Sequence, residues 1–416
     1  MNRLMAFIHK IEKTITNIAF IAKHKIKTSH FTRCTAKMTF DKLVAFLLTL
    51  PRQSAQIAIN RFIKEKGYEF TLDKQSLFEA REKLSHTAFI DLNNNYFLQD
   101  YAYASNFKTF HGYRVIAVDG CVFDVPAGAD QFGTHKTNSE PSPKAQGAAF
   151  VDILNQYLLQ AQLKPYGTGE TNIVNQMIAR WVTNPKIQDL FLFDRGFFSR
   201  KLVRAIFGRA KFLFRVHSHC LCEVNQANKP DQVVVYRQSG EADLCLRVIN
   251  YVLPNGEIEK LVTNIFDPSF SVEMFGELYR MRWGVETCFR TLKSRLEIEN
   301  FFSVKEEFIL QDFYASVFVY NLVMAAAHEA EIGVIKSEWQ KRKYVYQINK
   351  NVALAEVRSL LIESLCEENL DRRQELFRRT MATIASNELP VRPGRSFEHN
   401  VKHKSLKYPL NKKSAL

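Results

Sequence analysis

The sequence predicts a mixed α/β protein in which a strand-rich centre is flanked by helical segments. Between residues 113 and 216, runs rich in β-branched and aromatic residues alternate with two helical runs. Over 38–104, and again over 312–383, apolar residues recur at spacings of three and four, which is the spacing of one helix face. This arrangement favours one α/β core with helical attachments.

The N-terminal segment is predicted to be basic and helical. Residues 1–40 carry eight Lys or Arg against the single acid Glu12. Ser76 and Glu79 stand at the spacing of a capping box, and Arg81 is expected on a polar helix face. Short basic helices suit a DNA-binding module or a plain helical cap on the core, and the sequence leaves both open.

The centre begins with four strand-like runs. YRVIAVDG and CVFDVP, over 113–126, predict a hairpin, and AAFVDILN with YLLQAQLKPYG, over 148–167, predict another pair. NIVNQMIARWVT then predicts a helix before the strand LFLFD, and FSRKLVRAIFG predicts a helix before the strand KFLFRVH. This order of strands and helices matches the topology of the ribonuclease-H-like fold.

A β-rich insertion is predicted at about 217–270, where strand-like runs alternate with turns. Its first residues, RVHSHCLC, include the ligand types of a zinc site in His217, His219, Cys220 and Cys222. On a strand the histidines would point to one face and the cysteines to the other. The pattern therefore favours a strand leaving the core over a zinc site.

Three regions follow from these patterns. They are a basic, helical DNA-binding region over 1–104, a catalytic core over 105–311 that contains the insertion, and a helical C-terminal region over 312–416 with a basic tail. The longest apolar run, 313–327, is shorter than the roughly 20 residues that a bilayer needs, so it predicts a buried core helix. Seven cysteines without regular spacing predict a reducing cytoplasm.

The composition points to a polyanionic partner. The 416 residues are 46% hydrophobic and 24% charged, as in soluble globular proteins, but the formal net charge is +14. The excess lies mainly at the two ends, and 391–416 holds seven Lys or Arg against Glu398. Basic arms commonly lie on nucleic-acid backbones, with a merely solubilising tail as the alternative.

The run ELYRMRWGVETCFRTLKSRLEIENF is the most informative segment. On an α-helix, Tyr279, Arg282, Glu286 and Lys293 fall within an arc of roughly 60°, and Arg290 projects into the same arc. An adjoining apolar face is predicted to be buried, and it consists of Leu278, Met281, Val285, Cys288, Leu292 and Leu296. Such a helix can hold metal and phosphate, or it can be a solvated face with helical ion pairs.

Two aspartates end predicted strands. Asp119 closes RVIAVD and Asp194 ends LFLFD. An ionised carboxylate on an apolar strand is costly unless it is paired or binds metal, although strands also end in Asp at ordinary turns. With Glu286, the two aspartates form an oxygen set that can hold two magnesium ions. Two ions about 4 Å apart can stabilise both oxygens of a phosphoryl displacement.

The order VIAVDG, FLFDRGFFS and then Tyr279, Arg282, Glu286 and Lys293 resembles the DDE transposases of bacterial insertion sequences, in the branch with the Tyr-Arg-Glu-Lys signature. The resemblance covers roughly 113–302. It implies that the two aspartates and Glu286 are the catalytic metal ligands, with two Mg²⁺ ions as cofactor and Mn²⁺ as a possible substitute. It also implies a strand-rich insertion between the second aspartate and the glutamate.

The cations of the signature suit DNA binding. Arg282 can grip a phosphate with two donors, and Lys293 can do so as a point charge. Tyr279 can donate a hydrogen bond to a phosphate or stack on a sugar or base, and Arg290 lies in the same arc. Each of the three signature residues could instead only brace Glu286.

Two further residues are DNA-binding candidates. Arg195 could approach the backbone from the opposite wall or pair with a core carboxylate, and Trp283 could stack near the cleavage site or simply pack. Some relatives stack an aromatic of the insertion on a flipped base to stabilise a hairpin end. No tryptophan lies within 217–270, and strand packing is the preferred role for Tyr236 and Tyr251.

The predicted function is cut-and-paste transposition of an insertion sequence at its terminal inverted repeats. Water would free the 3′-hydroxyl ends, which would then attack target DNA at the same carboxylates. The partners are double-stranded DNA and a second copy in at least a dimer, with no membrane partner, in the bacterial cytoplasm at the nucleoid. The alternatives are a ribonuclease-H-like nuclease without strand transfer and a domesticated, non-catalytic DNA-binding protein.

Overall fold

The computed structural model describes residues 3–33, 35–99, 101, 107–135, 142–184, 186–217, 220–333, 343–365, 367 and 369–392. The chain divides into two compact units. The sheet unit comprises Tyr103–Phe123 and Ala145–Arg290. The helical unit comprises Met1–Ala102, Asp124–Lys144 and Thr291–Leu416.

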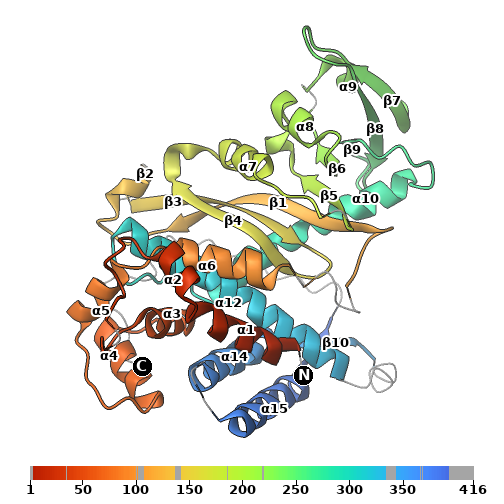
Figure 1. Cartoon of the computed structure of the whole chain (residues 1–416). Coiled ribbons are helices and arrows are strands. Elements are labelled where there is room, and N and C mark those ends of the chain that lie inside the picture. The colour runs from red at the N-terminus through yellow and green to blue at the C-terminus, as the bar shows by residue number, and fades with distance from the viewer. Residues whose placement is uncertain are drawn as a thin grey trace. The chain divides into compact units, whose positions relative to one another are not determined.

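A mixed sheet of nine strands lies mainly in the sheet unit, while β2 and the first residues of β3 are counted with the helical unit (Figure 1). Eight strands follow the order β2-β3-β1-β5-β6-β9-β8-β7, and β4 pairs with β3. Strands β1, β5 and β6 are parallel neighbours. The strands are β1 (Tyr113–Asp124), β2 (Thr134–His135), β3 (Ser142–Asp152), β4 (Tyr157–Pro165), β5 (Gln188–Phe193), β6 (Lys211–Arg215), β7 (Asp231–Tyr236), β8 (Leu244–Val252) and β9 (Ile258–Thr263).

The strand order β4-β3-β1-β5-β6 confirms the predicted ribonuclease-H-like core. Helix α7 (Glu170–Ala179) connects β4 to β5, and α8 (Arg200–Ile206) connects β5 to β6. The predicted hairpin over 113–126 is wrong, because β1 is one strand of twelve residues. Gly120 has no positive φ, so the chain passes through it without a turn.

The residues of the predicted insertion extend the core sheet. Strand β9 pairs antiparallel with β6, and β8 and β7 continue from it. The strand expected to run on through His217 ends at Arg215, and Cys222 begins the short helix α9 (Cys222–Asn225). His219, a member of the His and Cys cluster, lies outside the described residues.

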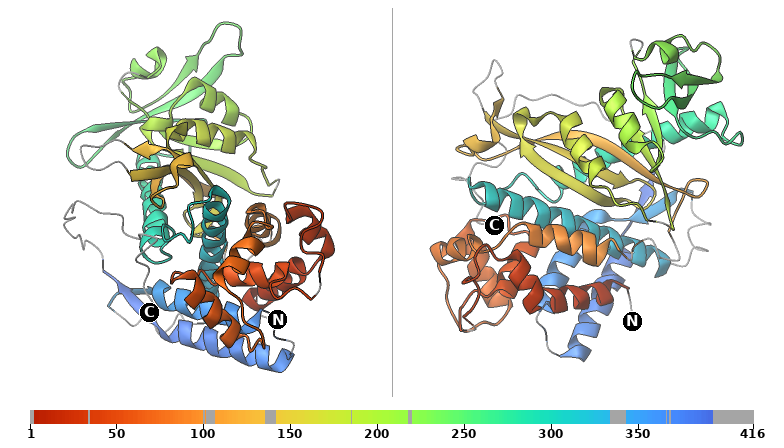
Figure 2. Two further views of the ribbon diagram at one scale, coloured as in Figure 1. Left: turned by 90° about the vertical axis from the view of Figure 1, so that its left-hand side faces the viewer. Right: turned by 45° about the horizontal axis from the view of Figure 1, so that its top comes forward.

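The sheet unit buries both faces of its sheet. Helices α7 and α8 lie on one face, and α10 (Val272–Arg280) lies on the other (Figures 1 and 2). On the α10 face, Val115, Leu190 and Leu213 pack with Phe275 and Leu278 in one buried cluster. Burying a Leu or Phe side chain contributes about 1.5–3 kcal/mol, so this cluster fixes α10 to the strands.

The helical unit is built around α12 (Glu306–Gly333), which packs against α1, α3, α6, α14 and α15 (Figure 2). Residues 313–327 of α12 are buried, as the sequence predicts. Helix α12 is long and apolar enough to cross a membrane by length and composition, a test that the core helix of a soluble protein also passes. The other elements are α1 (Arg3–Ile15), α2 (Ile18–His24), α3 (Phe40–Leu48), α4 (Ala55–Glu65), α5 (Lys74–Arg81), α6 (Thr87–Asp91), the π-helix η1 (Leu92–Phe97), the 3₁₀ turn η3 (Asp130–Phe132), α14 (Lys350–Ser364), α15 (Leu370–Ser386) and the paired strands β10 (Val345–Ile348) and β11 (Glu388–Val391).

Two local predictions in the helical unit are wrong. Helix α5 begins at Lys74 and is capped by Asp73, whose side chain accepts a hydrogen bond from the Ser76 amide at 2.7 Å, so Ser76 is not the N-cap. Arg81 is fully buried rather than on a polar face. Its guanidinium donates to Asp312 at 2.7 Å, a partner that local sequence does not reveal.

Candidate active site

Asp119 and Asp194 follow equivalent positions of two neighbouring parallel strands. Val118 of β1 pairs with Phe193 of β5, and each is followed by one of the aspartates. Neighbouring strands lie about 4.8 Å apart, so the register brings the two carboxylates to the same region of the sheet. After Asp194, the 3₁₀ turn Arg195–Phe197 leads into α8.

The signature residues lie on two helices and the turn between them. Helix α10 ends at Arg280, a 3₁₀ turn covers Met281–Trp283, and α11 covers Gly284–Ser294. The single continuous helix assumed from the spacing is therefore wrong. At the joint, a Cβ on Gly284 would lie 3.0 Å from the Ile153 side chain, so the chain packs closely there. The predicted apolar face is buried except for Met281, which is partly buried.

Arg282 lies between two of the predicted metal ligands. Its Nη1 is 3.3 Å from Asp119 Oδ2, and its Nη2 is 3.7 Å from Glu286 Oε1. The side chain is 6% exposed, and its guanidinium carbon is 4.9 Å from the centre of the Trp283 ring. Within the described part of the chain, its Nε has no hydrogen-bond partner. Arg282 therefore supplies a buried positive charge that bridges Asp119 and Glu286.

Tyr279 holds the other aspartate. Its hydroxyl donates a hydrogen bond to Asp194 Oδ1 at 3.0 Å. Burial raises the pKa of the Tyr279 phenol well above its ordinary value, and the charge of Asp194 raises it further. The phenol therefore remains a protonated donor at physiological pH.

The Asp119 carboxyl ionises at a higher pH than an ordinary aspartate. Burial raises its pKa to about 6, and the charges of Glu170 and Glu286 add to the rise. The Arg282 charge and the hydrogen bond from the Gly120 amide oppose it. A cation bound beside Asp119 would favour its ionised form.

Sequence reasoning missed Glu170 beside Asp119. A Cβ on Gly120 would lie 2.2 Å from Glu170 Cδ, which shows that the Glu170 side chain lies against this glycine. Gln146 Nε2 donates to Glu170 Oε1 at 2.9 Å. A glutamate in the first turn of a helix is common because it complements the helix dipole, so the sequence carries no signal of this role.

Sequence reasoning also missed Glu259 and Arg215, whose charges lie near Asp194. They form an ion pair at 3.2 Å, and Glu259 lies on β9 in the insertion. Burial raises the pKa of Glu259, Arg215 lowers it, and the Asp194 charge raises it again. Strand β9, from the predicted insertion, thus adds a charge to the surroundings of Asp194, which no spacing in the sequence indicates.

The remaining predicted residues have different surroundings. Lys293, on the last turn of α11, pairs with Glu299 at 3.0 Å within the helical unit. Arg195 and Arg290 are exposed, and Trp283 is 56% exposed. In the insertion, Tyr236 is buried and the Tyr251 ring packs against Gly276, so both tyrosines serve packing.

The carboxylates fit a hard divalent cation by chemistry. Among the residues that the structure describes, no three His, Cys, Asp or Glu side chains are close enough together to hold one ion. Carboxylate oxygens are nevertheless the ligands that Mg²⁺ and Mn²⁺ prefer, and the Arg282 guanidinium already stands as a cation between Asp119 and Glu286. An ion bound at these two carboxylates would compete with that guanidinium.

Residues 110–322 match the family described as the transposase DDE domain, which is more than half of the chain. The chain belongs to the DDE transposase family. This transposase is 25% identical over 334 residues to transposase InsG for insertion sequence element IS4 of Escherichia coli K12, a match that covers 73% of this chain and 71% of InsG. The predicted resemblance to transposases of bacterial insertion sequences is confirmed.

Two further proteins resemble this transposase. Over 77 residues it is 31% identical to the probable transposase for insertion sequence element IS5377 of Geobacillus stearothermophilus, covering 18% of this chain and 20% of that one. A structure of the piggyBac transposase synaptic complex with hairpin DNA aligns with a TM-score of 0.42 and 11% identity, covering 94% and 84% of the two chains. The family makes this chain an enzyme of DNA cleavage and strand transfer, and such enzymes typically use divalent metal ions.

Proposed function

We propose that this transposase moves an insertion sequence by a cut-and-paste reaction at terminal inverted repeats, with Asp119, Asp194 and Glu286 as its catalytic residues. The supporting observations are the β1–β5 register, in which the two aspartates follow paired residues, and the Arg282 bridge from Asp119 to Glu286. In the hydrolytic step, water attacks the phosphorus and the 3′ oxygen leaves. In the joining step, that 3′-hydroxyl attacks a target phosphorus and a target 3′ oxygen leaves.

The three carboxylates would hold two Mg²⁺ ions, for which Mn²⁺ could substitute. Bound there, the ions would supply charge stabilisation to the attacking and leaving oxygens. Tyr279 orients Asp194 through its hydroxyl, and Arg282 orients Asp119 and Glu286. These contacts fix the carboxylate oxygens before DNA arrives.

DNA contacts are assigned to exposed cations and one aromatic ring near the carboxylates. Arg195 follows Asp194 directly and is exposed. Arg290 lies one turn beyond Glu286 on α11, and Trp283 presents an exposed ring beside the buried Arg282. Tyr279, Arg282 and Lys293 already bind carboxylates of this chain. Each would have to leave its carboxylate partner in order to contact a phosphate.

Replacement of Glu286 by Gln tests the assignment. We expect the variant to lose both cleavage and strand transfer on labelled element ends while its DNA affinity stays within about twofold of wild type, because the isosteric amide loses the charge that holds the cation. Glu277→Gln is the matched control, since Glu277 is an exposed glutamate of α10. Strand transfer by Glu286→Gln in magnesium would refute the role of Glu286.

The same assay separates the alternatives. A ribonuclease-H-like nuclease would cut the ends without joining them to target DNA, and a domesticated binding protein would do neither. Joining two element ends requires both in one complex, so the proposed active form is at least a dimer. The proposed place of action is the bacterial cytoplasm, at the nucleoid, without a membrane partner.

A further inference from the structure

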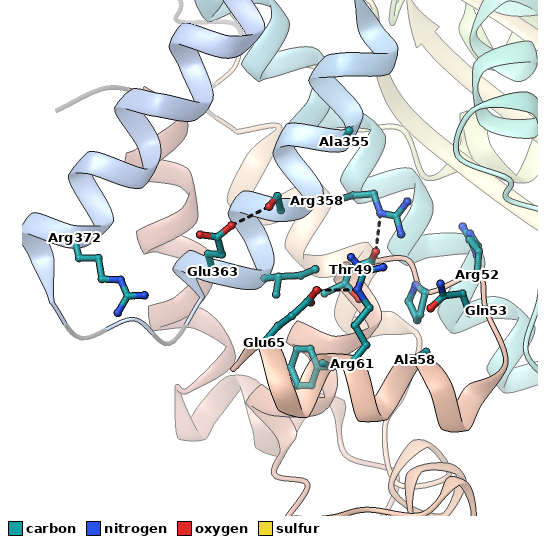
Figure 3. A pocket seen from close by; sticks show the side chains of 14 residues that line it. Thr49, Arg52, Gln53, Ala58, Arg61, Glu65, Ala355, Arg358, Glu363 and Arg372 are labelled. Carbon is teal, nitrogen blue, oxygen red and sulfur yellow. Dashed lines mark hydrogen bonds and ion pairs between the residues drawn. The ribbon is translucent and has the colours of Figure 1, made fainter. Parts of the chain in front are cut away.

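The helical unit contains a charged pocket of about 640 Å³ lined by α4, α14, the chain between α3 and α4, and Arg372 of α15 (Figure 3). Its lining has more cations than anions. The charged side chains are Arg52, Arg61, Arg358 and Arg372 against Glu65 and Glu363. A pocket of this size and charge suits an anion larger than chloride.

Arg358 is fixed in place without a carboxylate partner. Its Nε donates to the Thr49 carbonyl at 2.9 Å and its Nη2 donates to the Leu50 carbonyl at 3.1 Å. These carbonyls follow the last residues of α3, where a helix leaves acceptors unsatisfied. Within the described part of the chain, no acidic side chain lies within 4.0 Å of its guanidinium nitrogens. Backbone oxygens thus position the Arg358 guanidinium, and the charges of Glu297 and Glu65 offset only part of the effects that lower its pKa.

A second guanidinium approaches the same pocket. Arg61 extends from α4 and Arg358 from α14 toward the region of Thr49 (Figure 3). Burial lowers the pKa of Arg358, and the charge of Arg61 lowers it further. Arg61 is paired with Glu65 at 2.7 Å, whereas the charges that raise the pKa of Arg358 are those of Glu297 and Glu65. The two like charges repel each other, and an anion placed between them would relieve that repulsion.

We propose that this pocket binds phosphate groups of a DNA backbone, as a contact separate from the catalytic carboxylates. Arginine forks match the geometry of phosphate oxygens and bind them by two hydrogen bonds. Arg52 is not part of the proposed contact, because it donates to the Leu296 carbonyl and to Ser316. The choice of DNA as the source of phosphate rests on the proposed transposase reaction. The proposal puts a DNA contact in the helical unit, which contains none of Asp119, Asp194 and Glu286.

Salt-dependent DNA binding tests the proposal. Anisotropy of a labelled duplex is measured in EDTA, which prevents cleavage, over a range of salt concentrations. Each phosphate contact contributes about 0.9 to the slope of log K against log salt. We expect Arg61→Gln and Arg358→Gln each to reduce the slope by about one. Glu363→Gln, which removes a negative charge from the pocket, should strengthen binding.

Arg378→Gln is the matched control, because Arg378 is a 71% exposed arginine that pairs with Glu375 outside the pocket. Arg358 also donates hydrogen bonds to the end of α3, so Arg358→Gln could affect folding as well as DNA binding. Arg61→Gln and Glu363→Gln avoid that structural role, and the Arg61 side chain is 62% exposed, so its replacement should leave the fold intact. Wild-type slope and affinity in both variants would overturn the proposal.

Inorganic phosphate separates the two possible sources of the anion. If phosphate raises the melting temperature of the wild type but not of Arg61→Gln, while DNA binding is the same in both, the pocket takes a free phosphate and the DNA assignment is overturned. Failure of the proposed reaction would give a different result. If the wild type binds DNA with the expected slope but neither cuts nor joins it, the reaction is refuted and the phosphate-binding role of this pocket still stands.

Discussion

Replacing Arg282 by Gln would show whether its guanidinium holds the acidic side chains before metal binds. The 3.3 Å contact with Asp119 is a charge-assisted hydrogen bond from a side chain that is 6% exposed. Such bonds contribute about 1.5–3 kcal/mol. The contact with Glu286 is 3.7 Å and involves a carboxylate that is 42% exposed, so it adds little. We expect the free energy of unfolding to fall by about 2 kcal/mol.

Thermal unfolding in EDTA and in Mg²⁺ measures both parts of this effect. For a unit of this size, 1 kcal/mol shifts Tm by roughly 2–4 °C, so Arg282→Gln should melt about 4–8 °C below wild type in EDTA. In Mg²⁺ the ion no longer competes with the guanidinium, and the variant should gain more in Tm than the wild type does. The control is Arg195→Gln, since Arg195 is exposed.

Two results would refute this reasoning. If Arg282→Gln melts with the wild type in EDTA, the guanidinium does not stabilise the carboxylates. If Mg²⁺ raises the Tm of the variant no more than that of the wild type, ion and guanidinium do not compete for Asp119 and Glu286. The salt dependence of DNA binding without metal would then show whether Arg282 contacts a phosphate instead. If it does, Arg282→Gln should lower the slope of log K against log salt by about one.

Three further predictions concern other parts of the chain. Arg81→Met should lower the free energy of unfolding of the helical unit by about 3–5 kcal/mol, measured in urea, because it leaves a buried carboxylate without its cation; an unchanged midpoint would contradict this. Burial lowers the pKa of His24 more than Asp91 raises it, so below pH 6.5 the unfolded chain binds more protons than the folded chain does. The contribution of His24 to stability is therefore complete above pH 6.5 and is lost as the pH falls below that value. His24→Gln should therefore flatten the decline in Tm below pH 6.5, and a decline as steep as that of the wild type would count against it. Gly120→Ala should displace Glu170 and slow DNA cleavage by about tenfold or more, whereas Gly167→Ala, which meets no neighbouring atom, should cleave at the wild-type rate.

The sequence predicts those elements whose local signal agrees with their tertiary surroundings. The runs that form β5 and β6 are apolar and short because both strands are buried in the sheet. Gly120 looked like a turn, but the strand continues through it with ordinary backbone angles. Arg81 looked solvent-facing because its partner Asp312 is 231 residues away. Long-range pairing of this kind leaves no trace in local periodicity.

The candidate site shows the same limit. Asp119 and Asp194 could be predicted because each ends an apolar run, and Glu286 because its helical neighbours have a regular spacing. Their roles in catalysis remain predictions. The positions of Glu170 and Glu259 could not be predicted, since they depend on how α7 and β9 meet the core strands.

The position of Arg282 connects the two roles that its sequence spacing allows. Burial raises the pKa of Asp119 and the charges of Glu170 and Glu286 raise it further, so the metal-free site carries a desolvation cost and a repulsion that some cation must offset. A guanidinium can do this because its fork matches carboxylate oxygens, and the same fork matches phosphate oxygens. If a metal ion takes over the carboxylates, the guanidinium becomes available to a phosphate without any change of chemistry. Arg282 then holds Asp119 and Glu286 when metal is absent and can bind a phosphate when metal is present.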